Sequence, residues 1–157
     1  MSNELKDWIG DFTDEQKKNY ELCMQYPILI PDNDDEYMYE YSKLDFFPAG
    51  WKKAFGEQWA KEVQAAINKM PIGVQKEAYI TDIKEKWGQL IVFLSVYSEE
   101  LDTVLKKYEQ LSETVCCQCG KSKTEVFDGW FSYLCDDCEN ELMKRRKNFR
   151  GWLDADC

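Results

Sequence analysis

The architecture follows from two consecutive stretches, WKKAFGEQWAKEVQAAINKM (residues 51–70) and YITDIKEKWGQLIVFLSVY (residues 79–97). In the first, apolar residues recur every three or four positions, which predicts an amphipathic helix that ends before Pro71. The second is rich in β-branched and aromatic residues on both sides of Gly88, which predicts a β-hairpin whose glycine adopts a positive φ. Since apolar residues fall on both faces of its second strand, we expect that strand to be covered on both sides. The helical stripe consists of Trp51, Phe55, Trp59, Val63, Ile67 and Met70.

The segment before this helix contains one predicted helix and one predicted strand. Thr13 and Gln16 have the spacing of a capping box, which predicts a helix from Asp14 to Gln25 that stops before Pro27. Acidic and aromatic residues alternate from Glu36 to Tyr41, as they do in a half-buried strand. The expected buried residues of the helix are Tyr20, Cys23 and Met24.

Two further helices are expected after the hairpin. Ser98 is a suitable N-cap for a helix whose first turn is acidic, and a basic helix is expected at 139–153. The chain is thus predicted to be an α+β protein, with helices packed on a small antiparallel hairpin-based sheet and a C-terminal zinc ribbon. We expect an acidic α+β domain at 1–114, and the ribbon with its basic helix at 115–157, in one compact unit.

Composition narrows the classes of function. The 157 residues include 20 basic and 30 acidic side chains and no histidine, so Ser-His-Asp and Cys-His catalysis are excluded. The net charge of −10 argues against nucleic acid covering the whole surface. The start of the chain has no signal-peptide pattern and the longest apolar run is only Leu90 to Leu94, so we expect a cytoplasmic protein that does not enter membranes.

The cysteines carry the most specific pattern. Cys116 and Cys119 form one CxxC pair, Cys135 and Cys138 form another, and 15 residues separate the pairs. This spacing is typical of structural zinc sites, in which each CxxC turn directs two thiolates at one ion. Two disulfides are the alternative, but paired cysteines in a reducing compartment are more often metal ligands. Cys117 could replace Cys116 as a ligand.

Four thiolates would fill every position around a tetrahedral zinc ion. The predicted cofactor is therefore a structural Zn2+, which fixes a small subdomain and leaves no position for substrate. No pair of carboxylates lies in a motif that assigns catalytic roles, and no phosphate-binding P-loop is present, so we expect no enzymatic activity.

The order of these motifs resembles that of small, largely uncharacterised zinc-ribbon proteins of bacteriophages and prophages. The likeness extends from Tyr26-Pro27 through Gly50-Trp51 and the KEKWGQL hairpin at 84–90 to the two CxxC pairs at 116–119 and 135–138. The resemblance implies a viral accessory protein and supplies no mechanism. The acidic stretch at 32–45 and the basic tail depart from it.

Three segments are candidate binding surfaces. Residues 1–50 contain 12 acids and 4 bases, and their densest part could imitate a nucleic-acid backbone and block a host defence or nucleic-acid-binding protein, or could be only a solvated loop. The hairpin tip could hold a nucleotide through Lys84, Lys86 and the ring of Trp87. The basic tail could bind nucleic acid. The residues assigned to the acidic surface are Asp32, Asp34, Asp35, Glu36, Tyr37, Tyr39 and Tyr41.

We therefore expect a non-catalytic phage accessory or counter-defence protein that binds and blocks a host protein through its acidic, aromatic surface. A small-ligand binder that sequesters a nucleotide signal and a nucleic-acid-binding zinc ribbon are the alternatives.

Overall fold

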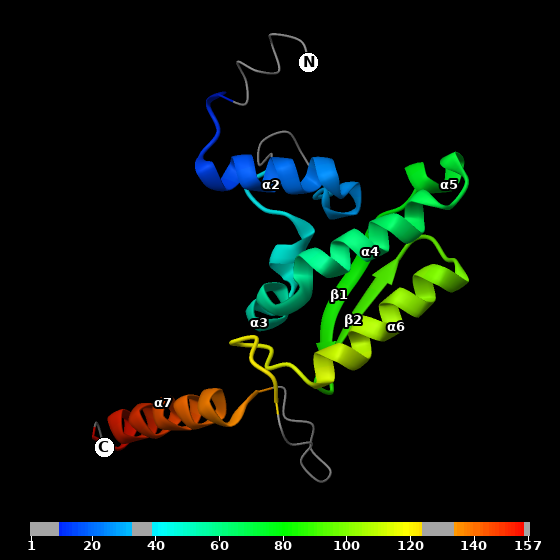
Figure 1. The fold of residues 1–157 in the computed structure, drawn as a ribbon. Coiled ribbons are helices and arrows are strands. Elements are labelled where there is room, and N and C mark those ends of the chain that lie inside the picture. Colours follow the sequence, from blue (N-terminus) through cyan, green and yellow to red (C-terminus); the bar gives the residue numbers. More distant parts are fainter. Residues whose placement is uncertain (1–9, 33–38, 124–133, 156–157) are drawn as a thin grey trace.

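A computed structural model describes residues 10–32, 39–123 and 134–155, with side chains to 148, and shows an α+β fold (Figure 1). The hairpin of β1 and β2 lies beside the central helices, α6 packs on β2, and α4 packs on α6. Helix α7 extends away from this body. The elements are α2 (Asp14–Gln25), η1 (Pro27–Leu29), η3 (Lys43–Phe46), α3 (Ala49–Trp51), η4 (Lys52–Gly56), α4 (Glu57–Asn68), α5 (Ile72–Lys76), β1 (Ile80–Lys86), β2 (Gln89–Leu94), α6 (Glu99–Glu113) and α7 (Asp136–Ala155).

Helix α2 begins and ends at the predicted residues. The hydroxyl of Thr13 accepts a hydrogen bond from the Gln16 N–H at 3.2 Å, and the Gln16 side chain accepts one from the Thr13 N–H at 2.9 Å, so the capping box is confirmed. Cys23 is fully buried, but the prediction for Met24 is wrong, because 48% of this residue is exposed. Leu22 packs against the core instead.

The central helix runs from Ala49 to Asn68 through α3, η4 and α4. Its η4 segment is a single π-helical turn, a wider turn that forms within α-helices. All six apolar residues of the predicted stripe are buried, and the helix ends before Pro71 as expected. Pro71 instead caps the start of the short helix α5, which the sequence pattern did not predict.

The hairpin is confirmed, and it turns through two residues. Lys86 pairs with Gln89, and Trp87 and Gly88 between them have φ values of 56° and 79°. Two successive positive φ values define a type I′ turn, which matches the right-handed twist of the strands. Only one face of β2 is well covered: Leu90 is buried, whereas Phe93 is 49% exposed. The expectation that both faces are covered is wrong, because the described helices pack on one side only.

Helix α6 is fixed at its start and along its length. The Ser98 hydroxyl accepts a hydrogen bond from the Leu101 N–H at 3.1 Å, and the Ser112 hydroxyl accepts one from the Leu90 N–H of β2 at 2.8 Å. Lys107 forms an ion pair with Glu62 of α4 at 2.7 Å. These contacts connect α6 to both of its neighbours.

The predicted strand at 36–41 is not present in its described part. Tyr39 has a φ of 60°, and its ring packs edge-on against Tyr20 of α2 at 5.0 Å between centroids. Residues 36–38 lie outside the described residues. The described end of this segment is therefore a turn held against α2.

Among the described residues, no helix combines the length and the apolar character that crossing a bilayer requires.

Candidate metal centre

Four cysteine sulfurs converge near the start of α7. The Sγ atoms of Cys116, Cys119, Cys135 and Cys138 all lie within 4.8 Å of one another, and those of Cys119 and Cys135 are 3.6 Å apart. A tetrahedral zinc site with Zn–S bonds of about 2.3 Å separates its sulfurs by about 3.8 Å. The cluster thus has the dimensions of a metal site.

Cys117 lies outside the cluster, which resolves the choice between it and Cys116. Burial, followed by the charge of Cys116, raises the pKa of Cys117 to about 11. The four sulfurs that converge therefore include that of Cys116 and not that of Cys117.

The first CxxC pair lies in a tight turn. Val115 and Ser122 form an antiparallel bridge, and the Cys116 N–H donates to the Lys121 carbonyl oxygen at 2.8 Å. The turn closes where the Gly120 N–H donates to the Cys116 carbonyl oxygen at 3.0 Å. Gly120 has a φ of 80°, a conformation that glycine adopts without steric cost. We call residues 115–122 the cysteine knuckle.

The second pair belongs to the start of α7. The Glu139 N–H donates to the Cys135 carbonyl oxygen at 2.9 Å, and Cys138 follows within the first helical turn. The second CxxC pair is therefore positioned by the first turn of α7.

The thiols of the cluster differ in their pKa values. Burial acts to raise the pKa of Cys116, but N–H groups of Cys119, Cys135 and Gln118 directed at its sulfur lower that pKa to about 6. The pKa of Cys138 is raised, first by burial and then by the neighbouring thiols. One thiolate therefore forms readily while the next is opposed, which is the situation that a bound divalent cation relieves.

The cysteine knuckle packs directly on the start of the central helix. The Gly50 N–H donates to the Cys117 carbonyl oxygen at 2.6 Å, and the indole Nε1 of Trp51 donates to the Val115 carbonyl oxygen at 2.8 Å. A Cβ on Gly50 would lie 2.3 Å from the Cys116 carbonyl oxygen, and one on Gly120 would lie 2.8 Å from the Gly50 carbonyl oxygen. Only glycine fits at both positions.

The structure divides the predicted acidic surface. Asp34, Asp35, Glu36 and Tyr37 lie outside the described residues. Asp32 forms an ion pair with Lys43. The rings of Tyr39 and Tyr41 contact Tyr20 and Phe46, so both tyrosines contribute to packing within the chain.

A different set of acids lines a groove between α2 and the central helix. Its volume is about 670 Å³, and Lys52 on its wall is paired with Asp45. Sequence reasoning missed this groove because its acids come from separate segments. Its charged lining residues are Asp14, Glu15, Lys18, Glu21, Asp45, Lys52 and Glu57. We call it the acidic groove.

At the hairpin tip, Lys84 and Lys86 belong to β1 and Trp87 to the turn that follows. Trp87 is 70% exposed, but Lys84 is engaged by Asp82 at 2.6 Å and lies 5.5 Å from the centre of the Phe93 ring. An incoming phosphate would have to displace Asp82 from Lys84.

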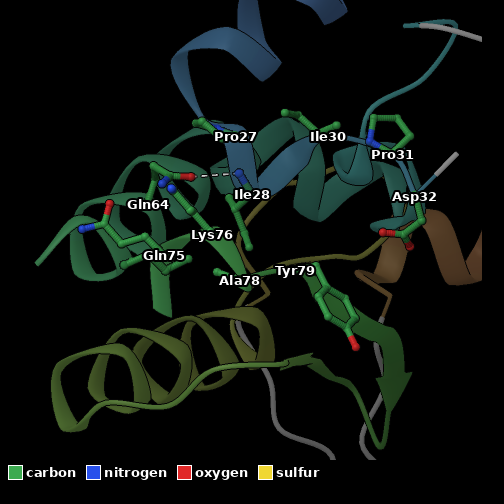
Figure 2. A pocket seen from close by; sticks show the side chains of 11 residues that line it. Pro27, Ile28, Ile30, Pro31, Asp32, Gln64, Gln75, Lys76, Ala78 and Tyr79 are labelled. Atoms are coloured by element: carbon green, nitrogen blue, oxygen red, sulfur yellow. Dashed lines mark hydrogen bonds between the residues drawn. The ribbon is translucent and has the colours of Figure 1, made fainter. Parts of the chain in front are cut away.

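A separate pocket of about 360 Å³ lies between η1, α4 and α5 (Figure 2). Ile28 and Ile67 are its buried apolar residues, and the side-chain oxygen of Gln64 accepts a hydrogen bond from the Ile28 N–H at 2.8 Å. Lys76 and the half-exposed Tyr79 also line it. This small pocket combines apolar and polar lining and does not include the hairpin tip.

No family model, curated protein or solved structure matches this chain. Its fold and its site define it as an α+β protein in which four cysteines converge within metal-binding distance.

Proposed function

We propose that the four cysteines hold one structural Zn2+. The single observation that carries this is the mutual approach of all four sulfurs to within 4.8 Å, together with a chain that contains no histidine to offer another ligand set. Four thiolates complete the tetrahedron that zinc prefers. The ion would join the cysteine knuckle to α7 as a zinc ribbon.

Metal analysis of the purified protein tests this site. Wild-type protein should contain one zinc per chain, and Cys135→Ser should lose most of it. Cys117→Ser is the matched control, because Cys117 lies outside the cluster and its loss should leave the zinc content unchanged. Equal zinc in the wild type and the Cys135→Ser variant would exclude the assignment.

We further propose that the protein is a non-catalytic binding module, of the kind that a phage uses to block a host defence or nucleic-acid-binding protein. Support comes from the charge distribution: the first 50 residues hold 12 acids against 4 bases, and the acidic groove gathers carboxylates from three parts of the chain. A concave surface with an excess of one charge attracts a partner of the opposite charge and orients it. The partner would present a basic segment to the groove.

An affinity capture from nuclease-treated bacterial lysate tests this function. The reversal Glu21→Lys with Glu57→Lys places two positive charges in the acidic groove. The matched control is Glu77→Lys with Glu99→Lys, which makes the same change of net charge on exposed acids outside the groove. A host protein captured by the wild type and the control, but lost with the groove variant, would support the proposal. Capture that is equal with all three proteins would refute a role for the groove.

A small-ligand binder is the second candidate, favoured by the pocket of Figure 2. Its volume of about 360 Å³ lies at the lower end of the range for ligand sites. Thermal unfolding with a nucleotide panel distinguishes the candidates, because a ligand at 100 times its Kd stabilises the fold by about 2.7 kcal/mol.

A further inference from the structure

Helix α7 has no covering partner in the described part of the chain. It leaves the cysteine cluster and extends away from the helical body (Figure 1). From Glu139 to Asn148, every side chain is exposed except that of Leu142, which is half-buried. Most of the stability of a helix in a protein comes from the packing of one of its faces, so α7 would gain from a partner.

The charges of α7 are segregated along its axis. Four acids occupy its first six positions, and four consecutive bases follow Leu142 and Met143, the two apolar residues between the groups. Met143 is 51% exposed. The acids are Asp136, Asp137, Glu139 and Glu141, and the bases are Lys144, Arg145, Arg146 and Lys147.

We propose that two copies of this chain pair through α7, with the helices antiparallel and crossing at Leu142 and Met143. A twofold axis at the crossing places the acidic half of each helix against the basic half of the other, and the exposed Met143 and half-buried Leu142 lie at the centre. A parallel pair would instead align acids with acids. Charge complementarity thus selects both the partner and the direction.

The shape of the protomer permits this pairing. Because each α7 starts at its own cysteine cluster and points away from its body, an antiparallel pair places the two bodies at opposite ends. With the crossing at Leu142 and Met143, residues 136–149 of the two helices overlap over about 20 Å, so the contact is small and rich in charge. The dimer should therefore be weak and should dissociate as salt screens the charges.

An antiparallel pair also gives more of the charges of α7 an opposite partner than nucleic acid would. A phosphate backbone would engage the four bases but would be repelled by the four acids that precede them. In the antiparallel pair both halves are matched.

Light scattering coupled to gel filtration tests the proposal on the full-length protein. In 50 mM salt, the wild-type mass should rise toward twice that of the monomer with increasing concentration, and it should return to the monomer in 500 mM salt. Glu139→Lys with Glu141→Lys gives α7 a strong excess of basic residues, and Lys144→Glu with Lys147→Glu gives it a strong excess of acidic residues. Each variant alone should be monomeric, whereas their equimolar mixture should form a heterodimer.

The rescue by mixing shows that both variants are folded, since unfolded chains would not pair. Met143→Asp should abolish the dimer, whereas Met24→Asp should not, because Met24 is equally exposed but lies on α2 (48% against 51%). A wild-type protein that is monomeric in 50 mM salt at all concentrations would overturn the proposal. So would a monomer that carries nucleic acid, detected by its 260 nm absorbance and lost with Lys144→Glu and Lys147→Glu. Neither result would affect the zinc site or the acidic groove.

Discussion

The indole nitrogen of Trp51 donates a hydrogen bond to the carbonyl oxygen of Val115 at 2.8 Å, and 64 residues of chain separate the two. Trp51 has no exposed surface and Val115 only 8%, so the bond lies in the interior, between the central helix and the cysteine knuckle. It fixes the place where the four-cysteine cluster joins the helical body.

Replacement of Trp51 by phenylalanine removes the donor and keeps an aromatic ring. The Val115 carbonyl would then be buried without this partner, so we expect the free energy of unfolding to fall by about 1–3 kcal/mol, with a further loss from the smaller ring. Urea denaturation measures the change. Trp87→Phe is the control, since Trp87 is 70% exposed, and a similar loss in both variants would contradict the role of the bond.

Replacement of Gly50 by alanine should disrupt the contact between the helix and the cysteine knuckle. Its Cβ would lie 2.3 Å from the Cys116 carbonyl oxygen, a distance that requires the backbone to move. We expect a lower melting temperature and weaker retention of zinc against a chelator.

The matched control for that change is Gly73→Ala in helix α5, where nothing lies within 4 Å of the new Cβ. Alanine favours helices over glycine by about 0.8–1 kcal/mol, so this variant should be slightly more stable than the wild type. If the two alanines had the same effect, the close approach of Gly50 to the cysteine knuckle would not matter for stability.

Replacement of Trp87 by asparagine should stabilise the hairpin. Trp87 has a φ of 56°, and asparagine tolerates this left-handed conformation better than other side chains do. Asn-Gly is also the preferred pair for a type I′ turn, so we expect a gain of about 0.5–1 kcal/mol in urea denaturation. Trp87→Val should have the opposite sign, because β-branched residues are disfavoured there. A loss of stability with asparagine would contradict the turn geometry. A nucleotide bound at the tip, if there is one, should be lost with the tryptophan.

Tyr108 should make stability sensitive to alkaline pH. Burial, and then a hydrogen bond to Glu62, raise the pKa of Tyr108 well above its ordinary value of 10. A group whose pKa is raised in the folded state contributes stability below its unfolded pKa and loses it as pH rises toward the folded value. Unfolding free energy should therefore decline above about pH 10.

Urea denaturation between pH 8 and pH 11 measures this decline, and Tyr108→Phe should show less of it. The absorbance of tyrosinate at 295 nm should report one fewer late-titrating tyrosine in the variant. An identical decline in both proteins would assign the sensitivity to other groups, such as Cys23, whose pKa burial raises to about 11.

The sequence was sufficient to predict those elements whose geometry depends on residues close together along the chain. The capping box of Thr13 and the helical stripe from Trp51 to Met70 led to the observed helices, and Gly88 marked the turn. The CxxC spacing identified the four cysteines that converge. In each case, residues a few positions apart determine the geometry.

The remaining features depend on which surfaces meet in three dimensions. Met24 lies on the apolar side of its own helix, yet no part of the described core reaches it. The acidic groove combines residues as distant as Asp14 and Glu57, which no local pattern connects. The role of Gly50 depends on a backbone that approaches from the far end of the chain.

The contact of Gly50 and Trp51 with the cysteine knuckle also sets an order of events during synthesis. A ribosome adds about 5–20 residues per second, so the 64 residues between Trp51 and Val115 take about 3–13 s to make. Throughout that interval, the central helix has emerged without the surface that will cover its first turn. The nascent chain therefore leaves Trp51 uncovered on this side until the cysteine knuckle leaves the exit tunnel. Cys135 and Cys138 leave the tunnel later still, so the four sulfurs can converge only after the cysteine knuckle has emerged.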